Sequence, residues 1–437
     1  MLKIYDLDTA QKTILRRQPL NFQQVPEGVK RSVEKLFGQG VTPYQAVSQI
    51  LSSVREEGDA ALRNWSRILD EIELEDFLVP RRELESAYQA LSPANREALQ
   101  TAADRIRDFH RRQPLPDWST TEMGGTLGQR ITPIQRAGVY VPGGSAPLPS
   151  SLLMSVIPAQ VAGVKQIIIS TPPRPDPGIL AGAHLCGIEE VYQVGGAQAI
   201  AAMAFGTESV PGVDIIVGAG NLFVTIAKQQ VYGIVGLDGL AGPTETMIIA
   251  DDTANPAWVA SDLLAQAEHD LLASAILLTP SQPLALAVQQ EVDRQVMDLE
   301  RSKIILQSLA DRGGAVITPD LETAASVADT YAAEHLCLAV ADPAGLAEQI
   351  NNAGGFFLGD YSFEVLGDYV AGPSHIMPTG GTARFSSPLN VLDFVKISSV
   401  VALDPDTGVA LSSAAAKIAR LESLTAHAAS AEFRRQP

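Results

Sequence analysis

Six histidines occur in the chain, and four of them stand beside groups that could bind a metal or move a proton. Gln266 and His269 come at the end of a helix expected to begin at Pro256. A spacing of three residues puts both side chains on one helix face, where they could hold a single metal ion. The helix dipole alone also favours a histidine near the carboxyl end of a helix. The spacing therefore leaves a metal ligand and a simple helix-end histidine both open.

The adjacent pair Glu334 and His335 stands just before an expected strand. Imidazole has an ordinary pKa of about 6.5, which suits proton transfer at neutral pH, and a neighbouring carboxylate could assist it. Neighbours on an extended segment point to opposite faces, so a chance surface pair is the alternative. The sequence spacing alone does not decide between the two.

Two further acid and histidine pairs occur near the end of the chain. Asp368 and His375 lie in a Gly- and Pro-rich segment, which we expect to be an irregular functional loop. Asp368 could be a hard oxygen ligand and His375 an anion contact, whereas an Asx turn and a surface histidine are the alternatives. Glu422 and His427 are five residues apart, about 140° around a helix, and need not share a face. A solvated terminal histidine is the simpler interpretation of His427.

Composition and charge exclude several classes of protein. The 437 residues are 46% hydrophobic and 19% charged, which predicts two or three globular cores rather than disorder. The net charge of -18 argues against nucleic acid and anionic membranes as partners. Only two cysteines are present, which favours a reducing compartment. The first residues lack a secretory signal, and the most apolar stretch, 151–169, contains Pro158 and Lys165. We therefore expect a soluble, cytoplasmic protein.

Hydrophobic periodicity predicts an α/β fold. Apolar residues recur at helical spacing from Val29 to about Arg112, with Ser92 as an expected helix cap. From Gly138 onward, short β-branched runs alternate with Ala-rich segments of helix length, and the last 50 or so residues return to helix. This alternation predicts two βαβ arrays, with strands at 139–141, 166–170, 190–194, 214–218, 246–250, 275–279, 315–318, 336–340 and 356–359.

Glycine-rich turns follow the strands of the first array. Gly138-Val-Tyr-Val leads into Pro-Gly-Gly-Ser, and the strand at 190–194 leads into Gly195-Gly-Ala-Gln. Turns at the carboxyl ends of parallel strands suit anionic or nucleotide ligands. A complete Gly-x-Gly-x-x-Gly is absent, since Gly218-Ala-Gly-Asn lacks the third glycine, and tight turns alone would explain these loops equally well.

Taken together, the motifs resemble those of the histidinol dehydrogenase family from about residue 20 to 430. The matching segments are Gly138-Val-Tyr-Val-Pro-Gly-Gly-Ser-Ala-Pro-Leu-Pro-Ser-Ser, Val194-Gly-Gly-Ala-Gln-Ala-Ile-Ala-Ala-Met-Ala-Phe-Gly-Thr, Ala241-Gly-Pro-Thr-Glu, Ser261-Asp-Leu-Leu-Ala-Gln-Ala-Glu-His, Ala333-Glu-His-Leu, Gly367-Asp-Tyr and Leu424-Thr-Ala-His. Two departures are minor: Thr244 stands where Ser is commoner, and Ala219 where Pro is usual.

The resemblance implies an NAD-dependent oxidation of L-histidinol, through the aldehyde, to L-histidine. It implies a zinc site made by Gln266, His269, Asp368 and His427, the last reaching in from the partner of a homodimer. His335 is then the general base and Glu334 activates water. The implied substrate contacts are these same six residues together with Thr244, His375 and Glu422, and the implied cofactor contacts are Tyr140, Gln198 and Asn221.

The same resemblance implies two incomplete Rossmann-like domains with helical extensions at both ends. We expect an N-terminal arm at 1–28, a first α/β domain from 29–135 and 244–385, and an inserted second α/β domain at 136–243. Residues 386–437 are expected to form a helical tail that crosses to the partner subunit. A related zinc- and NAD-dependent dehydrogenase of another polar alcohol, such as a sulfonated diol, remains an alternative, as does a zinc hydrolase or a zinc-binding protein without catalysis.

Overall fold

The computed structural model describes residues 2–17, 27–143 and 147–435. It forms two compact units: unit 1 comprises Met1–Arg112 and Gln135–Asp393, and unit 2 comprises Gln113–Ile134 and Phe394–Pro437. No helix within the described ranges is long and apolar enough to cross a membrane. Part of the first glycine turn, 144–146, and part of the expected N-terminal arm, 18–26, lie outside the described residues.

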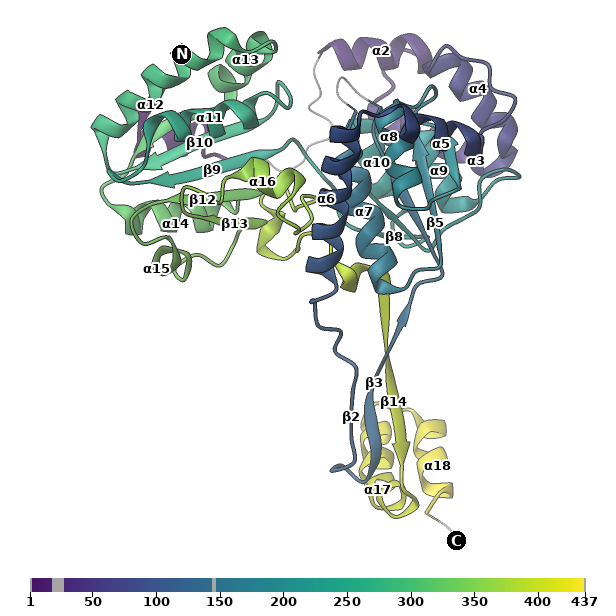
Figure 1. Ribbon diagram of the computed structural model, residues 1–437. Coiled ribbons are helices and arrows are strands. Elements are labelled where there is room, and N and C mark those ends of the chain that lie inside the picture. Colours follow the sequence, from purple (N-terminus) through teal and green to yellow (C-terminus); the bar gives the residue numbers. More distant parts are fainter. Residues whose placement is uncertain (1, 18–26, 144–146, 436–437) are drawn as a thin grey trace. The chain divides into compact units, whose positions relative to one another are not determined.

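A six-stranded parallel sheet forms one part of unit 1 (Figure 1). Strands β9 and β10 are buried along their whole length, which is typical of parallel strands covered by helices on both faces. The spatial order of the strands is β1-β11-β10-β9-β12-β13, with bounds β1 (Ile4–Asp6), β9 (Glu245–Ala250), β10 (Ser274–Thr279), β11 (Gly314–Ile317), β12 (His335–Ala339) and β13 (Gly355–Leu358).

Helices cover both faces of this sheet because strand residues alternate between two cores. Ile248 and Ala250 of β9 pack with α11, α12 and α13, whereas Met247 and Ile249 pack with α14 and α15. The helices and 3-10 turns of this part are α1 (Leu7–Lys12), α11 (Pro256–Ala267), α12 (Gln282–Gln295), η1 (Val296–Asp298), α13 (Ser302–Arg312), α14 (Leu321–Tyr331), α15 (Pro343–Ala347), α16 (Glu364–Tyr369), η2 (Thr382–Arg384) and η3 (Val391–Phe394).

A five-stranded parallel sheet forms the other part of unit 1, in the order β6-β5-β4-β7-β8. Its elements are β4 (Arg136–Tyr140), α7 (Pro149–Ala162), β5 (Gln166–Thr171), α8 (Pro177–Leu185), β6 (Val191–Gln193), α9 (Gly196–Phe205), β7 (Ile215–Val217), α10 (Leu222–Val231) and β8 (Gly236–Leu237). The two predicted βαβ arrays are thus confirmed, and each strand expected from the β-branched runs is observed.

The N-terminal helices pack on the five-stranded part. Helix α3 contacts α9 and α10, α5 contacts α8, and α6 contacts α7, whereas the sequence analysis grouped this region with 244–385. The expected cap is confirmed, because the Ser92 hydroxyl accepts a hydrogen bond from the Asn95 amide at the start of α6. The helices are α2 (Glu27–Phe37), α3 (Pro43–Glu57), α4 (Asp59–Leu69), α5 (Arg81–Ala90) and α6 (Pro93–His110).

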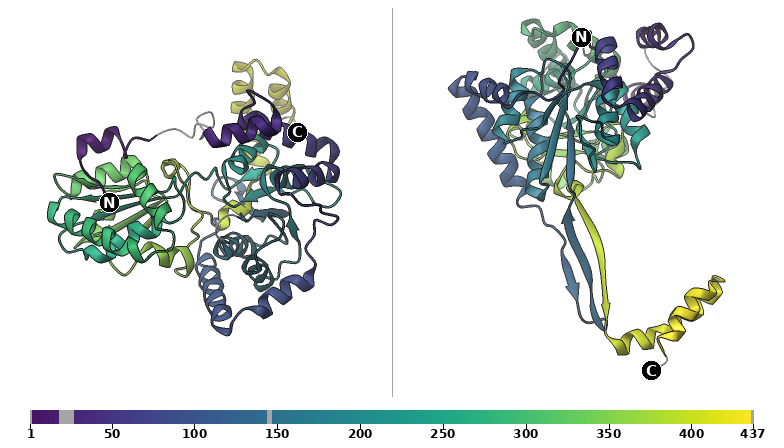
Figure 2. Two further views of the ribbon diagram at one scale, coloured as in Figure 1. Left: turned by 90° about the horizontal axis from the view of Figure 1, so that it is seen from above. Right: turned by 90° about the vertical axis from the view of Figure 1, so that its right-hand side faces the viewer.

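Unit 2 contains a three-stranded antiparallel ribbon and two helices (Figure 2). The strands are β2 (Trp118–Thr120), β3 (Gly125–Pro133) and β14 (Val395–Leu403), and the helices are α17 (Pro405–Leu421) and α18 (Thr425–Phe433). The tail expected to be helical from residue 386 is helical only from Pro405, apart from the short η3. The difference arises because β14 pairs with β3, far earlier in the chain, and a local pattern does not show such a partner.

Candidate active site

A cavity of about 160 Å³ in unit 1 is lined by six of the nine residues expected to contact metal or substrate. Thr244 directly precedes β9, and Glu334 directly precedes β12, which begins at His335. Strands β9 and β12 are parallel neighbours, so their amino ends bring these side chains together. The polar side chains that line the cavity include Ser150, Ser151, Thr244, His269, Glu334, His335, Asp368, His375 and Thr379.

His335 is held by the backbone at one ring nitrogen. Nδ1–H donates to the carbonyl of Glu245 at 3.3 Å, and the residue is only 3% exposed. The other nitrogen, Nε2, has no hydrogen-bond partner among the described residues and lies 3.6 Å from Oδ1 of Asp368. In a neutral imidazole held in this way, Nε2 carries the lone pair. In its neutral form the ring therefore accepts a proton at Nε2.

Glu334 lies beside His335 and is buried with it. Its Oε2 is 3.7 Å from Nδ1 of His335, and both side chains line the cavity. Burial raises the pKa of the Glu334 carboxyl to about 7. The alternative of a chance surface pair is therefore wrong.

The sequence analysis missed a third carboxylate, Glu364. Its Oε1 lies 3.9 Å from Nδ1 of His335, and its Oε2 accepts a hydrogen bond from Thr246. Burial opposes the charged form of His335, but Glu364, Glu334 and Asp368 outweigh burial and raise the His335 pKa to about 10. Glu364 and Asp368 are four residues apart on α16, and this helical spacing is the signal that could have revealed Glu364.

Asp368 and His375 contact each other, but not within one irregular loop. Asp368 lies on the short helix α16, so the loop expected there begins only after Tyr369. His375 donates through Nδ1 to the Asp368 carbonyl at 2.8 Å and accepts at Nε2 from the Ser151 hydroxyl at 2.9 Å. Both ring nitrogens of His375 are thus engaged within the protein, and Ser151 is a second residue that the sequence analysis did not single out.

Gln266 is joined to Glu334 through one hydroxyl group. Its Nε2 donates to Oγ1 of Thr244 at 3.0 Å, and that hydroxyl donates to Oε2 of Glu334 at 2.6 Å. The other amide atom, Oε1 of Gln266, is buried and has no hydrogen-bond partner within the described part of the chain. A buried carbonyl oxygen without a donor is unfavourable unless another positive group reaches it.

The unpaired oxygen of Gln266 bears on the expected metal site. Gln266, His269 and Asp368 offer an oxygen, a nitrogen and an oxygen donor, a set that zinc accepts, and the unpaired Oε1 fits a cation. Across residues 2–17, 27–143 and 147–435, no group of three or more His, Cys, Asp or Glu is placed to hold a metal by itself. The chemistry of these three side chains thus suits zinc, but the described residues form no complete metal site.

Glu422 and His427 belong to unit 2. Glu422 follows the last residue of α17, and His427 lies on α18; both are exposed. Ser423, between them, has a left-handed backbone with φ 61°, so the two residues do not share one continuous helix. Whether either side chain reaches the cavity stays a prediction.

A second cavity, of about 410 Å³, lies at the carboxyl ends of the five-stranded sheet and is lined by all three expected cofactor contacts. The Tyr140 hydroxyl accepts a hydrogen bond from the Gly196 amide at 3.1 Å, and Asn221 caps α10 by accepting from Phe223 and Val224. Oε1 of Gln198 is buried and, among the described residues, unpaired. The glycine turns thus border a cavity of a size that suits part of a dinucleotide.

The N-terminal helices supply an apolar wall that the sequence analysis did not foresee. Val33, Leu36 and Phe37 of α2, with Ile50 of α3, face the cofactor-sized cavity. Pro142 lines both cavities, so the two are neighbours. A planar cofactor held in the larger cavity could therefore approach a substrate held in the smaller one.

Comparisons with known proteins agree with this arrangement. The sequence model described as "Histidinol dehydrogenase" matches residues 39–435. Histidinol dehydrogenase of Thermus thermophilus is 51% identical over 394 residues, covering 90% of this chain and 95% of the relative. That of Deinococcus radiodurans is 49% identical over 416 residues, covering 94% and 95%. The crystal structure of histidinol dehydrogenase from Elizabethkingia anophelis superposes with a TM-score of 0.90 at 34% identity, covering 99% of this chain and 98% of that one. This chain belongs to the histidinol dehydrogenase family.

Proposed function

We propose that this chain oxidises L-histidinol, through L-histidinal, to L-histidine, with the reduction of two NAD, as the last step of histidine biosynthesis in the cytoplasm. Family membership supports this reaction. The observation that carries it is His335, which lines one cavity and whose Nε2 has no hydrogen-bond partner among the described residues, while Pro142 lines both this cavity and the cofactor-sized one.

His335 is the general base in this proposal. Hydride leaves the alcohol carbon only as the hydroxyl proton departs, and Nε2 of His335 accepts that proton. The backbone carbonyl of Glu245 keeps Nδ1 of His335 protonated. The ring could turn Nδ1–H toward the substrate only by losing this hydrogen bond.

Glu334 has a separate task in the second oxidation. The aldehyde must be hydrated before a second hydride can leave, and a carboxylate can orient and deprotonate the attacking water. Two donors, Thr244 and the Glu245 amide, both reach Oε2 of Glu334. No donor in the described part of the chain reaches Oε1, which is thus the oxygen that contacts water.

Gln266, His269 and Asp368 hold zinc in this proposal, with His427 of the partner subunit as the fourth ligand. When bound, zinc would supply a Lewis acid able to orient the imidazole and amine of histidinol, and its positive charge would lower the pKa of His335. Thr244, His375 and Glu422 complete the substrate contacts, and Tyr140, Gln198 and Asn221 contact NAD.

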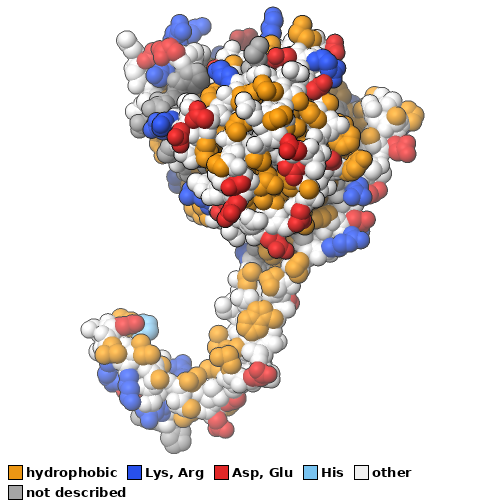
Figure 3. All heavy atoms as spheres, turned by 90° about the vertical axis from the view of Figure 1, so that its left-hand side faces the viewer, with side chains coloured by type: hydrophobic (Ala, Val, Ile, Leu, Met, Phe, Trp, Pro, Cys, Tyr) orange, Lys and Arg blue, Asp and Glu red, His pale blue; other side chains and the backbone are white. Residues whose placement is uncertain are grey.

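A homodimer follows from this assignment, because unit 2 carries two of the site residues. Apolar side chains are exposed on its strands and helices, among them Ile397, Val401, Leu411, Ile418 and Leu421 (Figure 3). Exposed apolar patches of this kind mark interaction surfaces. We assign this surface to contact with a second copy of the chain.

The test is a substrate panel with NADH absorbance as the readout. Zinc-loaded protein is mixed with NAD and, separately, with L-histidinol, other amino alcohols and a sulfonated diol. We expect NADH to form with L-histidinol. NADH formation with the diol but not with histidinol would overturn the proposal in favour of a related dehydrogenase, and hydrolysis of esters or amides without NADH would favour a zinc hydrolase.

A further inference from the structure

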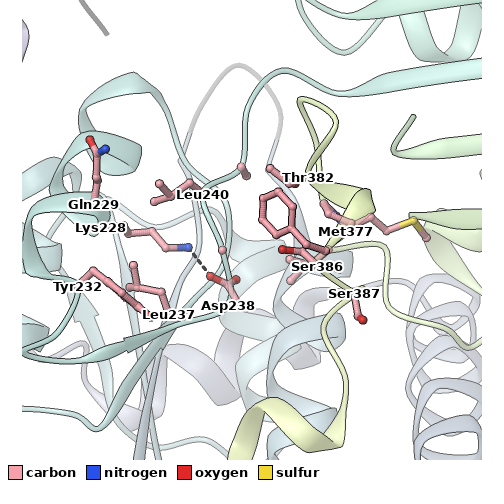
Figure 4. A pocket seen from close by; sticks show the side chains of 15 residues that line it. Lys228, Gln229, Tyr232, Leu237, Asp238, Leu240, Met377, Thr382, Ser386 and Ser387 are labelled. Carbon is pink, nitrogen blue, oxygen red and sulfur yellow. Dashed lines mark hydrogen bonds and ion pairs between the residues drawn. The ribbon is translucent and has the colours of Figure 1, made fainter. Parts of the chain in front are cut away.

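A buried ion pair lies in the five-stranded part of unit 1, outside the residues assigned above. Lys228 of α10 and Asp238, which follows β8, form an ion pair with side-chain exposures of only 3% and 5% (Figure 4). Removing two charges from water is unfavourable unless their remaining hydrogen bonds are satisfied. The hydrogen-bond partners of Lys228 and Asp238 indicate what this ion pair does.

Both charged groups bind the backbone of the same glycine. The ammonium of Lys228 donates to the carbonyl of Gly218 at 2.9 Å, and Oδ2 of Asp238 accepts from the amide of Gly218 at 2.7 Å. Hydrogen bonds to ionised groups are about twice as strong as neutral ones. The ion pair therefore holds Gly218 from both sides of its backbone.

A residue with a side chain does not fit at position 218, because the backbone there lies close to the neighbouring strand. The φ of Gly218 is 106°, and a Cβ atom there would lie 2.2 Å from the carbonyl oxygen of Tyr140. The turn that begins at Gly218 is thus pressed against the end of β4 on one side and held by the ion pair on the other.

The turn at 218–221 forms part of the wall of both cavities. Ala219 lines the substrate cavity, and Asn221 lines the cofactor cavity and caps α10, the helix that carries Lys228. A shift of Gly218 would move both walls together. The ion pair is thus placed to control how a cofactor in one cavity faces a substrate in the other.

We propose that Lys228 and Asp238 are a positioning pair that sets the 218–221 turn for NAD binding. This inference rests on the proposed NAD-dependent function. Neither side chain touches the cofactor in this account; they act through the backbone of Gly218 and through Asn221.

The test compares Lys228→Met with Lys228→Arg and a matched control. Tyr232→Ala is the control, because Tyr232 is 73% exposed and lines the same cavity as the pair without a hydrogen bond to Gly218 in the described structure. We expect Lys228→Met to raise the Kd for NADH and the KM for NAD about tenfold, because the variant loses one charge-assisted hydrogen bond. The KM for histidinol should change less than the KM for NAD, because Ala219 is the one residue of the 218–221 turn that lines the substrate cavity. Lys228→Arg should restore part of the loss, and Tyr232→Ala should resemble the wild type.

If the ion pair were merely structural, Lys228→Met would lower the Tm and the amount of folded protein. The Kd of the folded fraction for NADH would then stay unchanged. Should Lys228→Met fail to fold, the double variant Lys228→Met with Asp238→Leu leaves no unpaired charge and takes its place in the same measurements. An unchanged Kd for NADH in either folded variant would overturn the positioning role. Wild-type protein that binds no NADH would instead overturn the proposed function, and the positioning role with it.

Discussion

The Thr244 hydroxyl donates a 2.6 Å hydrogen bond to Oε2 of Glu334 and at the same time accepts a 3.0 Å bond from Nε2 of Gln266. One hydroxyl therefore orients both the carboxylate proposed to activate water and the amide proposed to bind zinc. Because Nε2 is engaged in this way, Oε1 of Gln266 is left buried without a donor among the described residues.

Replacing Thr244 with valine should uncouple these two side chains. Thr244→Val keeps the shape of the residue but leaves Nε2 of Gln266 without its acceptor and Oε2 of Glu334 with the Glu245 amide as its one remaining donor among the described residues. We expect kcat with histidinol to fall about tenfold or more, since misoriented catalytic groups lose that much. Steady-state kinetics would measure the loss. Thr244→Ser retains the hydroxyl and should stay within about twofold of the wild type; full activity in Thr244→Val would contradict the role assigned to this hydroxyl.

Glu334→Gln should separate the two oxidations. Only the aldehyde step needs activated water, so we expect the variant to oxidise histidinol while the oxidation of added histidinal falls by about 10²-fold or more. His335→Gln should slow both steps, because both release a proton. Single-turnover kinetics with each substrate would resolve the two rates. Equal impairment of both steps by Glu334→Gln would show that the roles are wrongly divided.

The pH dependence of the aldehyde step provides a control for this variant. Burial raises the Glu334 pKa to about 7, so the carboxyl is protonated and unable to deprotonate water below that pH. The rate of histidinal oxidation in the wild type should therefore rise as pH increases through about 7. In Glu334→Gln only His335 of this pair still titrates, so the residual activity should rise less steeply over the same pH range.

Removing the metal should abolish histidinol oxidation. We expect a chelator to inactivate the protein and zinc to restore it, because the proposed donors form an open site with oxygen and nitrogen ligands. His269→Ala should lose bound zinc more severely than Gln266→Ala, since a neutral amide oxygen is the weaker ligand; the zinc content of each purified variant measures this. Full activity in protein shown to contain no metal would overturn the zinc assignment.

The shared site predicts complementation between two inactive variants. His427→Ala and His335→Ala proteins should each be inactive. If His427 acts in the partner's site, a mixed dimer has one site with both substitutions and one with neither, so mixing should restore activity. If His427 acts within its own chain, every site keeps one substitution. Continued inactivity after verified subunit exchange would therefore rule out the shared site.

The parallel sheets were predictable because their strands are short apolar runs separated by segments of helix length, as at Thr246 to Ala250. The pairing of β14 with β3 was not, because the two strands are far apart in the chain and β14 is mostly exposed. In the site, too, local features were predictable and long-range contacts were not. Glu334 and His335 stand out as adjacent residues, whereas Arg17 does not, although it forms an ion pair with Glu245 and donates to the carbonyl of Tyr331, three residues before Glu334. Such a contact appears only once the chain is folded.

The number of NADH molecules formed per histidinol tests the central claim most directly. A limiting, known amount of L-histidinol is incubated with zinc-loaded protein and excess NAD, and NADH and the amino acid product are both quantified at completion. A four-electron oxidation in which His335 serves both steps and Glu334 supplies water predicts two NADH and one L-histidine per histidinol. One NADH per histidinol with accumulation of the aldehyde, or no NADH at all, would contradict it.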